Sequence, residues 1–212
     1  MAGYGSRFSN AGYQTPKPLI DMFGKTMIET VIENLHPRQH DVRFIFICQR
    51  EHYKAYGLEK IFNNCLDDSW ECFQIDGITE GAACTTLAAE SLIDDDAEVI
   101  IANSDQIVDC DLSDYINFAR DSKVDGLVMT FKANDEKWSY ISLDSQGFGL
   151  KVAEKRVISS NATVGIYYFS SGSDYKNAAH AMIKKDIRVN NEFYVAPVCH
   201  AGALPFQCHR DI

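Results

Sequence analysis

The stretch GKTMIETVIENLHPRQHDVRFIFIC, residues 24–48, indicates the fold class, because a helix pattern is followed directly by a buried-strand pattern. In Gly24–Leu35, apolar side chains fall on one helical face, and Thr26 with Glu29 three residues later is typical of a capping box. The nearly continuous apolar run Val42–Cys48 is typical of a strand buried in a parallel sheet. This order predicts an α/β protein.

The rest of the chain continues this alternation and then changes character. Helical patterns cover Ala83–Ile93 and Leu112–Ala119, and a second buried strand is predicted at Ala97–Ala102. The second half predicts a hairpin turn at Asp144–Gly147 and a helix at Ser173–Lys185. Its predicted strands are Gly126–Phe131, Trp138–Leu143, Gly149–Val152 and Thr163–Phe169. We therefore expect a three-layer α/β/α Rossmann-like fold with a mixed, mainly parallel central sheet.

Length and composition narrow the class of protein. The 212 residues contain no repeat, low-complexity tract or linker, so a single domain over residues 1–212 is the simplest interpretation. The formal net charge of -10 disfavours nucleic acid as a partner. Seven cysteines without a CxxC pair argue against a disulfide framework or a zinc site. No apolar stretch predicts a membrane span or a signal peptide, so we expect a cytoplasmic protein.

Two short motifs near the N-terminus carry chemistry suited to phosphates. In Ala2–Phe8 (AGYGSRF), glycines allow backbone N–H groups to approach phosphate oxygens, and Arg7 adds a fork of donors. In Pro16–Pro18, two prolines stiffen the backbone around Lys17, which could place its charge on a phosphate. Each motif alone is also compatible with an ordinary surface turn.

Together these motifs resemble a known signature. Gly-x-Gly-Ser-Arg-Phe, then Pro-Lys-Pro-Leu, then Gly-Lys-Thr-Met-Ile (residues 24–28) resembles the opening of the nucleotidyltransferase superfamily. That superfamily includes glucose-1-phosphate thymidylyltransferases and uridylyltransferases and the choline-phosphate cytidylyltransferases. The resemblance runs from Met1 to about Val198 and implies a GT-A-like fold. It also implies transfer of a nucleoside monophosphate from a nucleoside triphosphate to a phosphorylated acceptor, with a sugar 1-phosphate preferred and cell-surface polysaccharide synthesis as the setting.

The resemblance also implies roles for particular residues on the nucleotide side. Arg7 and Lys17 are expected to be catalytic, Arg7 by holding the pyrophosphate and Lys17 by stabilising charge at the α-phosphate. Asp105, in the segment Asn103–Gln106, resembles the strand-end aspartate that binds Mg²⁺, and a carboxylate there suits this ion. The expected nucleotide-binding residues are Ala2, Gly3, Gly5, Ser6, Thr79, Gly81 and Ala82, with Gly81 lying against the base.

On the acceptor side, Glu154 and Lys155 resemble the family's Glu-Lys pair, in which the lysine contacts the acceptor phosphate. Gly165, in the segment Asn161–Tyr167, is expected to clear space for the acceptor. The segment Asn190–Pro197 resembles the opening of a late helix, where packing and binding both remain open. The base, the acceptor and the oligomeric state are not specified by the sequence, and a homo-oligomer is compatible with it.

The chain departs from the family pattern at both ends. No strand precedes Gly3, and nothing matches the second metal-binding aspartate that relatives supply in a Trp-x-Asp context, so we expect the first strand and the C-terminal segment to be missing. A non-catalytic relative that binds nucleotide or sugar phosphate therefore stays an alternative, as does a cytidylyltransferase acting on choline phosphate or another non-sugar phosphate. A dinucleotide-binding oxidoreductase is disfavoured, because Phe8 takes the third glycine position and Pro16–Pro18 interrupts the helix that should follow.

Overall fold

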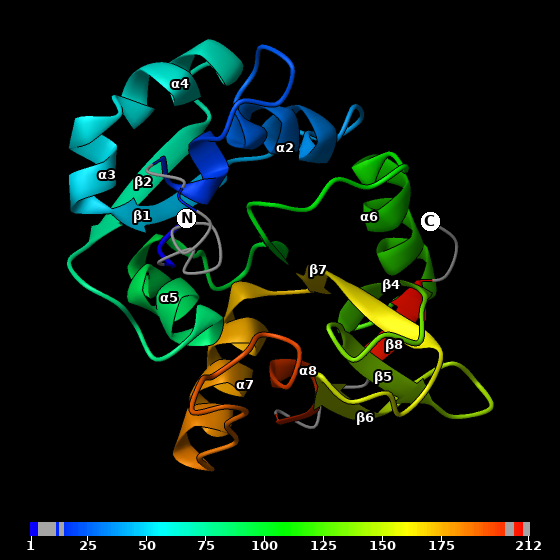
Figure 1. Cartoon of the computed structure of the whole chain (residues 1–212). Helices are drawn as coiled ribbons and strands as arrows, with labels where there is room; N and C mark the ends of the chain where they lie inside the picture. Colours follow the sequence, from blue (N-terminus) through cyan, green and yellow to red (C-terminus); the bar gives the residue numbers. More distant parts are fainter. Residues whose placement is uncertain (4–11, 13–14, 202–205, 210–212) are drawn as a thin grey trace. The chain divides into compact units, whose positions relative to one another are not determined.

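The computed structural model describes residues 1–3, 12, 15–201 and 206–209, and the chain folds into two compact units (Figure 1). Unit 1 comprises Met1–Thr79 and Ser104–Ser113, and unit 2 comprises Glu80–Asn103 and Asp114–Ile212. Each unit is described by itself below. The interpretation of residues 1–212 as one domain stays a prediction.

Unit 1 packs helices against a short parallel sheet. Its strands pair in register from Phe44 with Trp70 to Gln49 with Ile75. The predicted capping box is confirmed, because the Thr26 hydroxyl accepts from Glu29 N–H and the Glu29 carboxylate accepts from Thr26 N–H. The elements are η1 (Lys17–Leu19), α2 (Met27–Leu35), β1 (Phe44–Gln49), α3 (Arg50–Ala55), α4 (Leu58–Cys65) and β2 (Trp70–Ile75). The strand predicted at Val42–Cys48 is β1, whereas α3, α4 and β2 were not predicted.

Unit 2 is built on a mixed sheet in the order β6-β5-β7-β4-β8, with β3 also paired to β7. Its strands are β3 (Val99–Ala102), β4 (Gly126–Lys132), β5 (Ser139–Leu143), β6 (Gly149–Glu154), β7 (Asn161–Phe169) and β8 (Phe206–His209). Strands β3, β4 and β5 are antiparallel to β7, and β8 is parallel to β4. Four of these strands therefore run in one direction and β6 and β7 in the other, which confirms a mixed sheet of mostly parallel strands.

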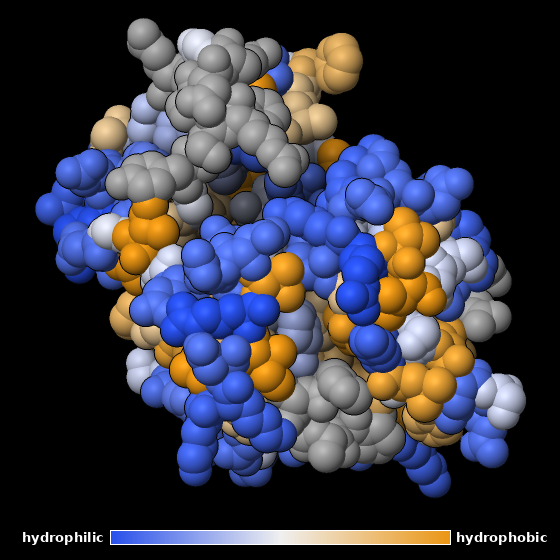
Figure 2. All heavy atoms as spheres, turned by 60° about the horizontal axis from the view of Figure 1, so that its bottom comes forward, coloured by the Kyte–Doolittle hydropathy of each residue, from blue (hydrophilic) through white to orange (hydrophobic). Residues whose placement is uncertain are grey.

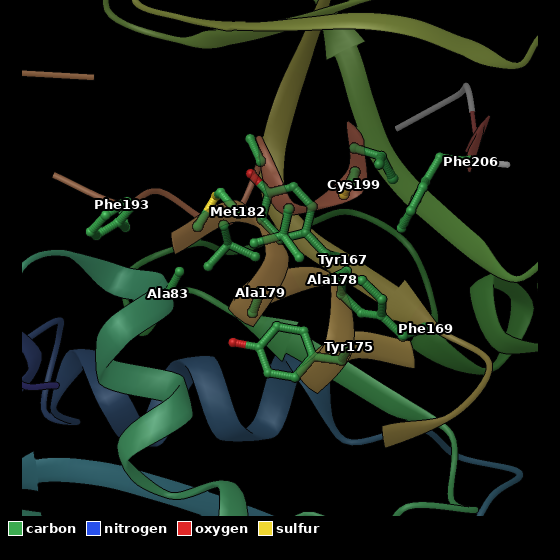
Figure 3. Packing of buried hydrophobic residues seen from close by; sticks show 14 of the residues in the cluster. Ala83, Tyr167, Phe169, Tyr175, Ala178, Ala179, Met182, Phe193, Cys199 and Phe206 are labelled. Atoms are coloured by element: carbon green, nitrogen blue, oxygen red, sulfur yellow. The ribbon is translucent and has the colours of Figure 1, made fainter. Parts of the chain in front are cut away.

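Helices cover both faces of this sheet, and β7 is buried along its whole length. On one face, α5 (Ala82–Ala88) and α7 (Gly172–Lys184) pack with the short α8 (Val198–Ala201) on Tyr167 and Phe169 of β7 (Figure 3). On the other, α6 (Leu112–Ser122) buries Tyr115, whose hydroxyl donates to the Leu127 carbonyl of β4 at 2.6 Å. The helix predicted at Ala83–Ile93 is α5 followed by the short η2 (Glu90–Leu92).

Hydrophilic residues cover much of the face shown in Figure 2, and hydrophobic residues form several patches among them. Within the described ranges, no helix combines the length and the apolar character that a membrane-spanning helix needs.

Candidate functional site

Lys17 and Asp105 form an ion pair in unit 1, although 88 positions separate them in the chain. Lys17 opens η1, whose turn closes through Leu19 N–H donating to the Pro16 carbonyl at 2.8 Å. Leu19 is buried, so the turn is anchored by packing as well as by the restricted backbone of Pro16 and Pro18. The local sequence thus presents the Lys17 ammonium at a defined place beside the Asp105 carboxylate.

Asp105 fits a divalent cation as a single protein carboxylate, and not as part of a complete set of protein ligands among the described residues. In the described part of the chain, no three His, Cys, Asp or Glu side chains form a metal-binding group. Mg²⁺ usually takes one or two protein carboxylates and completes its shell with water and substrate phosphates. One oxygen of Asp105 faces Lys17, and its side chain is 28 % exposed. The second oxygen and this exposure fit such a phosphate-completed site.

Ala2, the first residue of the glycine-rich motif, is attached to the end of β1 through Gln49. The Gln49 amide donates to the carbonyl of Ala2 at 2.8 Å and to the carbonyl of Gly77 at 2.6 Å. Ala2 is buried, whereas Gly3 is exposed. The predicted residues Gly5, Ser6 and Arg7 lie outside the described residues. Gln49 was not singled out in the sequence, although a polar residue ending an apolar strand is a usable signal.

Gly81 is required by its own backbone and by a close neighbour. It is the N-cap residue of α5 with φ +122° and ψ 174°, a conformation that only glycine adopts without strain. A β-carbon at this position would lie 2.6 Å from both the nitrogen and the carbonyl oxygen of Phe193. Phe193 N–H donates to the Glu80 carbonyl at 2.7 Å, and Ala83 N–H donates to the Phe193 carbonyl at 3.0 Å. Contact of Gly81 or Ala82 with a nucleotide base stays a prediction. Nucleotide binding by Thr79, the last residue of the range Met1–Thr79 of unit 1, also stays a prediction.

Gly165 lies at an irregularity of β7, where the pairing with β4 shifts between Val128 and Thr130. Its φ is +94°, and a β-carbon there would lie 2.1 Å from the side-chain nitrogen of Asn103. Asn103 also donates its N–H to the Gly165 carbonyl at 3.0 Å. The Asn103 amide thus occupies the space beside Gly165 that was expected to be cleared for an acceptor. A role of Gly165 in acceptor binding stays a prediction.

Glu154 ends β6 directly opposite Ser139, the first residue of β5. The Ser139 hydroxyl donates to one oxygen of the Glu154 carboxylate. Burial raises the pKa of Glu154, the Ser139 hydrogen bond and the Lys155 charge lower it, and the Glu192 charge raises it. The net direction is upward. An acid held half-buried beside a hydroxyl and a lysine is typical of a binding site.

Lys155 follows Glu154 with φ +51°, a left-handed backbone that is uncommon for lysine. Its N–H donates to the Trp138 carbonyl at 3.1 Å, which holds the backbone in this conformation. Its ammonium lies 3.3 Å from the Tyr194 hydroxyl and 5.5 Å from the centre of the Tyr194 ring. Unit 2 thus brings Ser139 and Tyr194 to the predicted acceptor residues Glu154 and Lys155. Neither Ser139 nor Tyr194 was predicted as a site residue.

A consequence of the half-buried Glu154 carboxylate is testable by pH. Because the folded-state pKa is raised, ionisation costs folding free energy, and this cost develops as the pH rises through the range above the unfolded value, about 4.3. Glu154→Gln is therefore expected to melt at a higher temperature than the parent protein at pH 7, with the gap shrinking below about pH 4. Thermal melts across pH check this, with the exposed Glu136→Gln in the same unit as control. A gap that widens on acidification would contradict it.

A separate cavity of about 340 Å³ in unit 1 contains none of the predicted site residues. It is lined by residues of the ranges 33–38 and 108–111. The Asn34 amide closes one wall through paired hydrogen bonds with the backbone of Val108, at 2.7 and 2.8 Å.

The fold is that of an α/β protein with a mixed sheet, and the chain belongs to the Nucleotidyl transferase family, which it matches over residues 1–194. The Bifunctional protein GlmU of Methanocaldococcus jannaschii is 26 % identical over 170 residues, which cover 79 % of this chain and 38 % of that protein. The chain thus spans well under half the length of this curated relative.

Two solved structures show the same fold at lower identity. The nucleoside-diphosphate-sugar pyrophosphorylase of Vibrio cholerae RC9 superimposes with a TM-score of 0.81 at 22 % identity, covering 100 % of this chain and 90 % of its own. A UDP-glucose pyrophosphorylase complexed with UDP-glucose gives 0.76 at 17 % identity, covering 99 % and 87 %. At these identities the two structures support the fold alone.

Proposed function

We propose that this protein transfers a nucleoside monophosphate from a nucleoside triphosphate to a sugar 1-phosphate, releasing pyrophosphate and forming a nucleoside-diphosphate sugar. The single observation that carries the proposal is the Lys17–Asp105 pair, because it joins the two charged residues of separate family motifs. A sugar as acceptor is supported by the similar solved structures, which are a nucleoside-diphosphate-sugar pyrophosphorylase and a UDP-glucose pyrophosphorylase complexed with UDP-glucose. We also propose that both units belong to one nucleotidyltransferase domain.

The proposed reaction needs positioning and charge more than it needs a general base. The attacking phosphate oxygen of the acceptor is already anionic, so its P–O bond to the α-phosphorus can form as the bond to pyrophosphate breaks. In unit 1, the Lys17 ammonium stabilises negative charge on the triphosphate. In unit 2, Lys155 holds the acceptor phosphate. Glu154 and Ser139 form hydrogen bonds with hydroxyl groups of the acceptor.

Asp105 is the residue that would hold a divalent cation such as Mg²⁺. When bound, the cation would neutralise phosphate charge and supply Lewis acidity. Lys17 pairs with the Asp105 carboxylate, so opposite charges lie together in a partly exposed place.

A matrix of nucleoside triphosphates against phosphorylated acceptors, scored by pyrophosphate release with Mg²⁺ present, tests the proposal. Release that depends on both substrates, with a sugar 1-phosphate as the best acceptor, is expected. Preference for choline phosphate or another non-sugar phosphate would contradict the proposed acceptor but would support the proposed reaction. Binding of a triphosphate or a sugar phosphate without release would identify a non-catalytic relative and contradict the proposal.

Lys17→Ala and Lys155→Ala are expected to damage different substrates. Each substitution removes a charge-assisted contact worth roughly 1.5–3 kcal/mol, or about 10–150-fold. Lys17→Ala should impair the use of the triphosphate, whereas Lys155→Ala should raise the KM for the acceptor. The exposed lysines Lys60 and Lys151 provide matched alanine controls in unit 1 and unit 2. A defect confined to the acceptor in Lys17→Ala would overturn the assignment of Lys17.

A further inference from the structure

The dipeptide Phe193–Tyr194 is held rigidly by the start of α5. Phe193 is buried, and its backbone makes hydrogen bonds of 2.7 Å with Glu80 and 3.0 Å with Ala83. The guanidinium of Arg188 also lies 4.1 Å from the centre of the Phe193 ring. Hydrogen bonds hold the Phe193 backbone, and Arg188 lies against its ring. The backbone of the next residue, Tyr194, therefore starts from a defined position.

Tyr194 places a neutral partner beside the Lys155 ammonium. The phenol oxygen accepts from the Lys155 Nζ at 3.3 Å, and the face of the ring lies 5.5 Å away, within the range of a cation–π contact. The Lys155 backbone is held independently, in its left-handed conformation, by the Trp138 carbonyl. A long lysine side chain is thus ordered at both its base and its tip.

The chemical nature of this partner matters because a carboxylate, that of Glu154, is the neighbour of Lys155 in the chain. Glu154 precedes Lys155 in the chain, and the charges of both Lys155 and Glu192 act on Glu154. A lysine paired with a carboxylate has its charge neutralised, whereas one held by a phenol keeps its full charge for an incoming anion. Tyr194 therefore orders the Lys155 ammonium without neutralising its charge.

We propose that Tyr194 is a positioning residue that holds Lys155 ready for the acceptor phosphate. This inference rests on the proposed function, because it assigns one more residue to the proposed acceptor site. Loss of the hydroxyl in Tyr194→Phe leaves the ring and the Phe193 anchor in place. The expected result is a rise of about 2- to 12-fold in the acceptor KM, the range of one ordinary hydrogen bond, with the triphosphate KM unchanged.

Steady-state pyrophosphate release by the parent protein, Tyr194→Phe, Lys155→Ala and the double variant tests this. If Tyr194 acts through Lys155, Tyr194→Phe adds nothing further in the Lys155→Ala background. Equal acceptor KM values for the parent protein and Tyr194→Phe, or additive effects in the double variant, would overturn the inference. Thermal melts that agree between the parent protein and Tyr194→Phe separate positioning from a loss of folding.

A second measurement needs no turnover and keeps the two proposals distinguishable. The lysines are ¹³C-methylated, the Lys155 signal is identified by its absence from Lys155→Arg, and inorganic phosphate is titrated by NMR. A saturable shift of this signal that weakens about 2- to 12-fold in Tyr194→Phe is expected. This result without pyrophosphate release would contradict only the proposed function. A parent protein whose Lys155 signal does not respond to phosphate would overturn the positioning role.

Discussion

Asp105→Asn is expected to lower the rate of pyrophosphate release by about 10²–10³-fold, the usual cost of removing one preorganised charge-stabilising group. Asparagine keeps the shape of the side chain but loses the negative charge that opposes Lys17 and suits a divalent cation. Titration of Mg²⁺ against the initial rate measures the effect, and the apparent affinity for the ion should fall together with the rate.

The fold should survive this substitution. Both side chains of the ion pair are about 30 % exposed, and pairs of this kind contribute at most about 1 kcal/mol to stability. Asp109→Asn, an exposed acid on the same segment of unit 1, is the matched control and should leave the rate unchanged. Full Mg²⁺-dependent activity in a folded Asp105→Asn protein would remove Asp105 from the metal role.

Gly81→Ala is expected to destabilise unit 2 by about 2–6 kcal/mol. A residue with a β-carbon pays roughly 1–3 kcal/mol for a backbone of φ +122°, and overpacking against the Phe193 backbone adds roughly 1–3 kcal/mol. For a chain of this size, the melting temperature should fall by about 4–24 °C. Calorimetry or circular dichroism during heating measures this shift.

Gly147 offers the control for Gly81, because it lies in the same unit with φ +92° and has no atom within 4 Å of an added β-carbon. Gly147→Ala should show the backbone penalty alone. If the two alanine variants melt at the same temperature, the close approach of Phe193 does not explain why position 81 is glycine. A loss of pyrophosphate release in Gly81→Ala at temperatures where it remains folded would support the prediction that this segment also binds nucleotide.

Local signals in the sequence predicted local structure well. The capping box of Thr26 and Glu29 needs only three residues of spacing, and the structure has α2 starting there. The turn predicted at Asp144–Gly147 is confirmed by Asp144 N–H donating to the Phe148 carbonyl at 2.8 Å. The strand β2 was missed, since polar residues interrupt the run Trp70–Ile75, and β8 was missed because its four residues carry too short a pattern.

In the candidate site too, the sequence predicted individual residues, whereas the structure showed the contacts between them. Sequence motifs identified Lys17, Asp105 and Lys155 as separate candidates, since each motif carries a recognisable residue at a recognisable place. No local pattern could show that Lys17 bonds Asp105, that Tyr194 bonds Lys155, or that Asn103 occupies the space beside Gly165. These contacts join residues far apart in the chain.

By itself, the sequence of this protein determined its family, its alternation of helix and strand, and the residue types available for phosphate chemistry. These properties depend on side-chain period, capping and motif spacing, which are local in the chain. Only the tertiary structure decided which partners those residues meet and why Gly81 must be glycine. The physical reason is that pairing across β7 and packing against Phe193 depend on positions brought together by folding, and side-chain order follows from those neighbours.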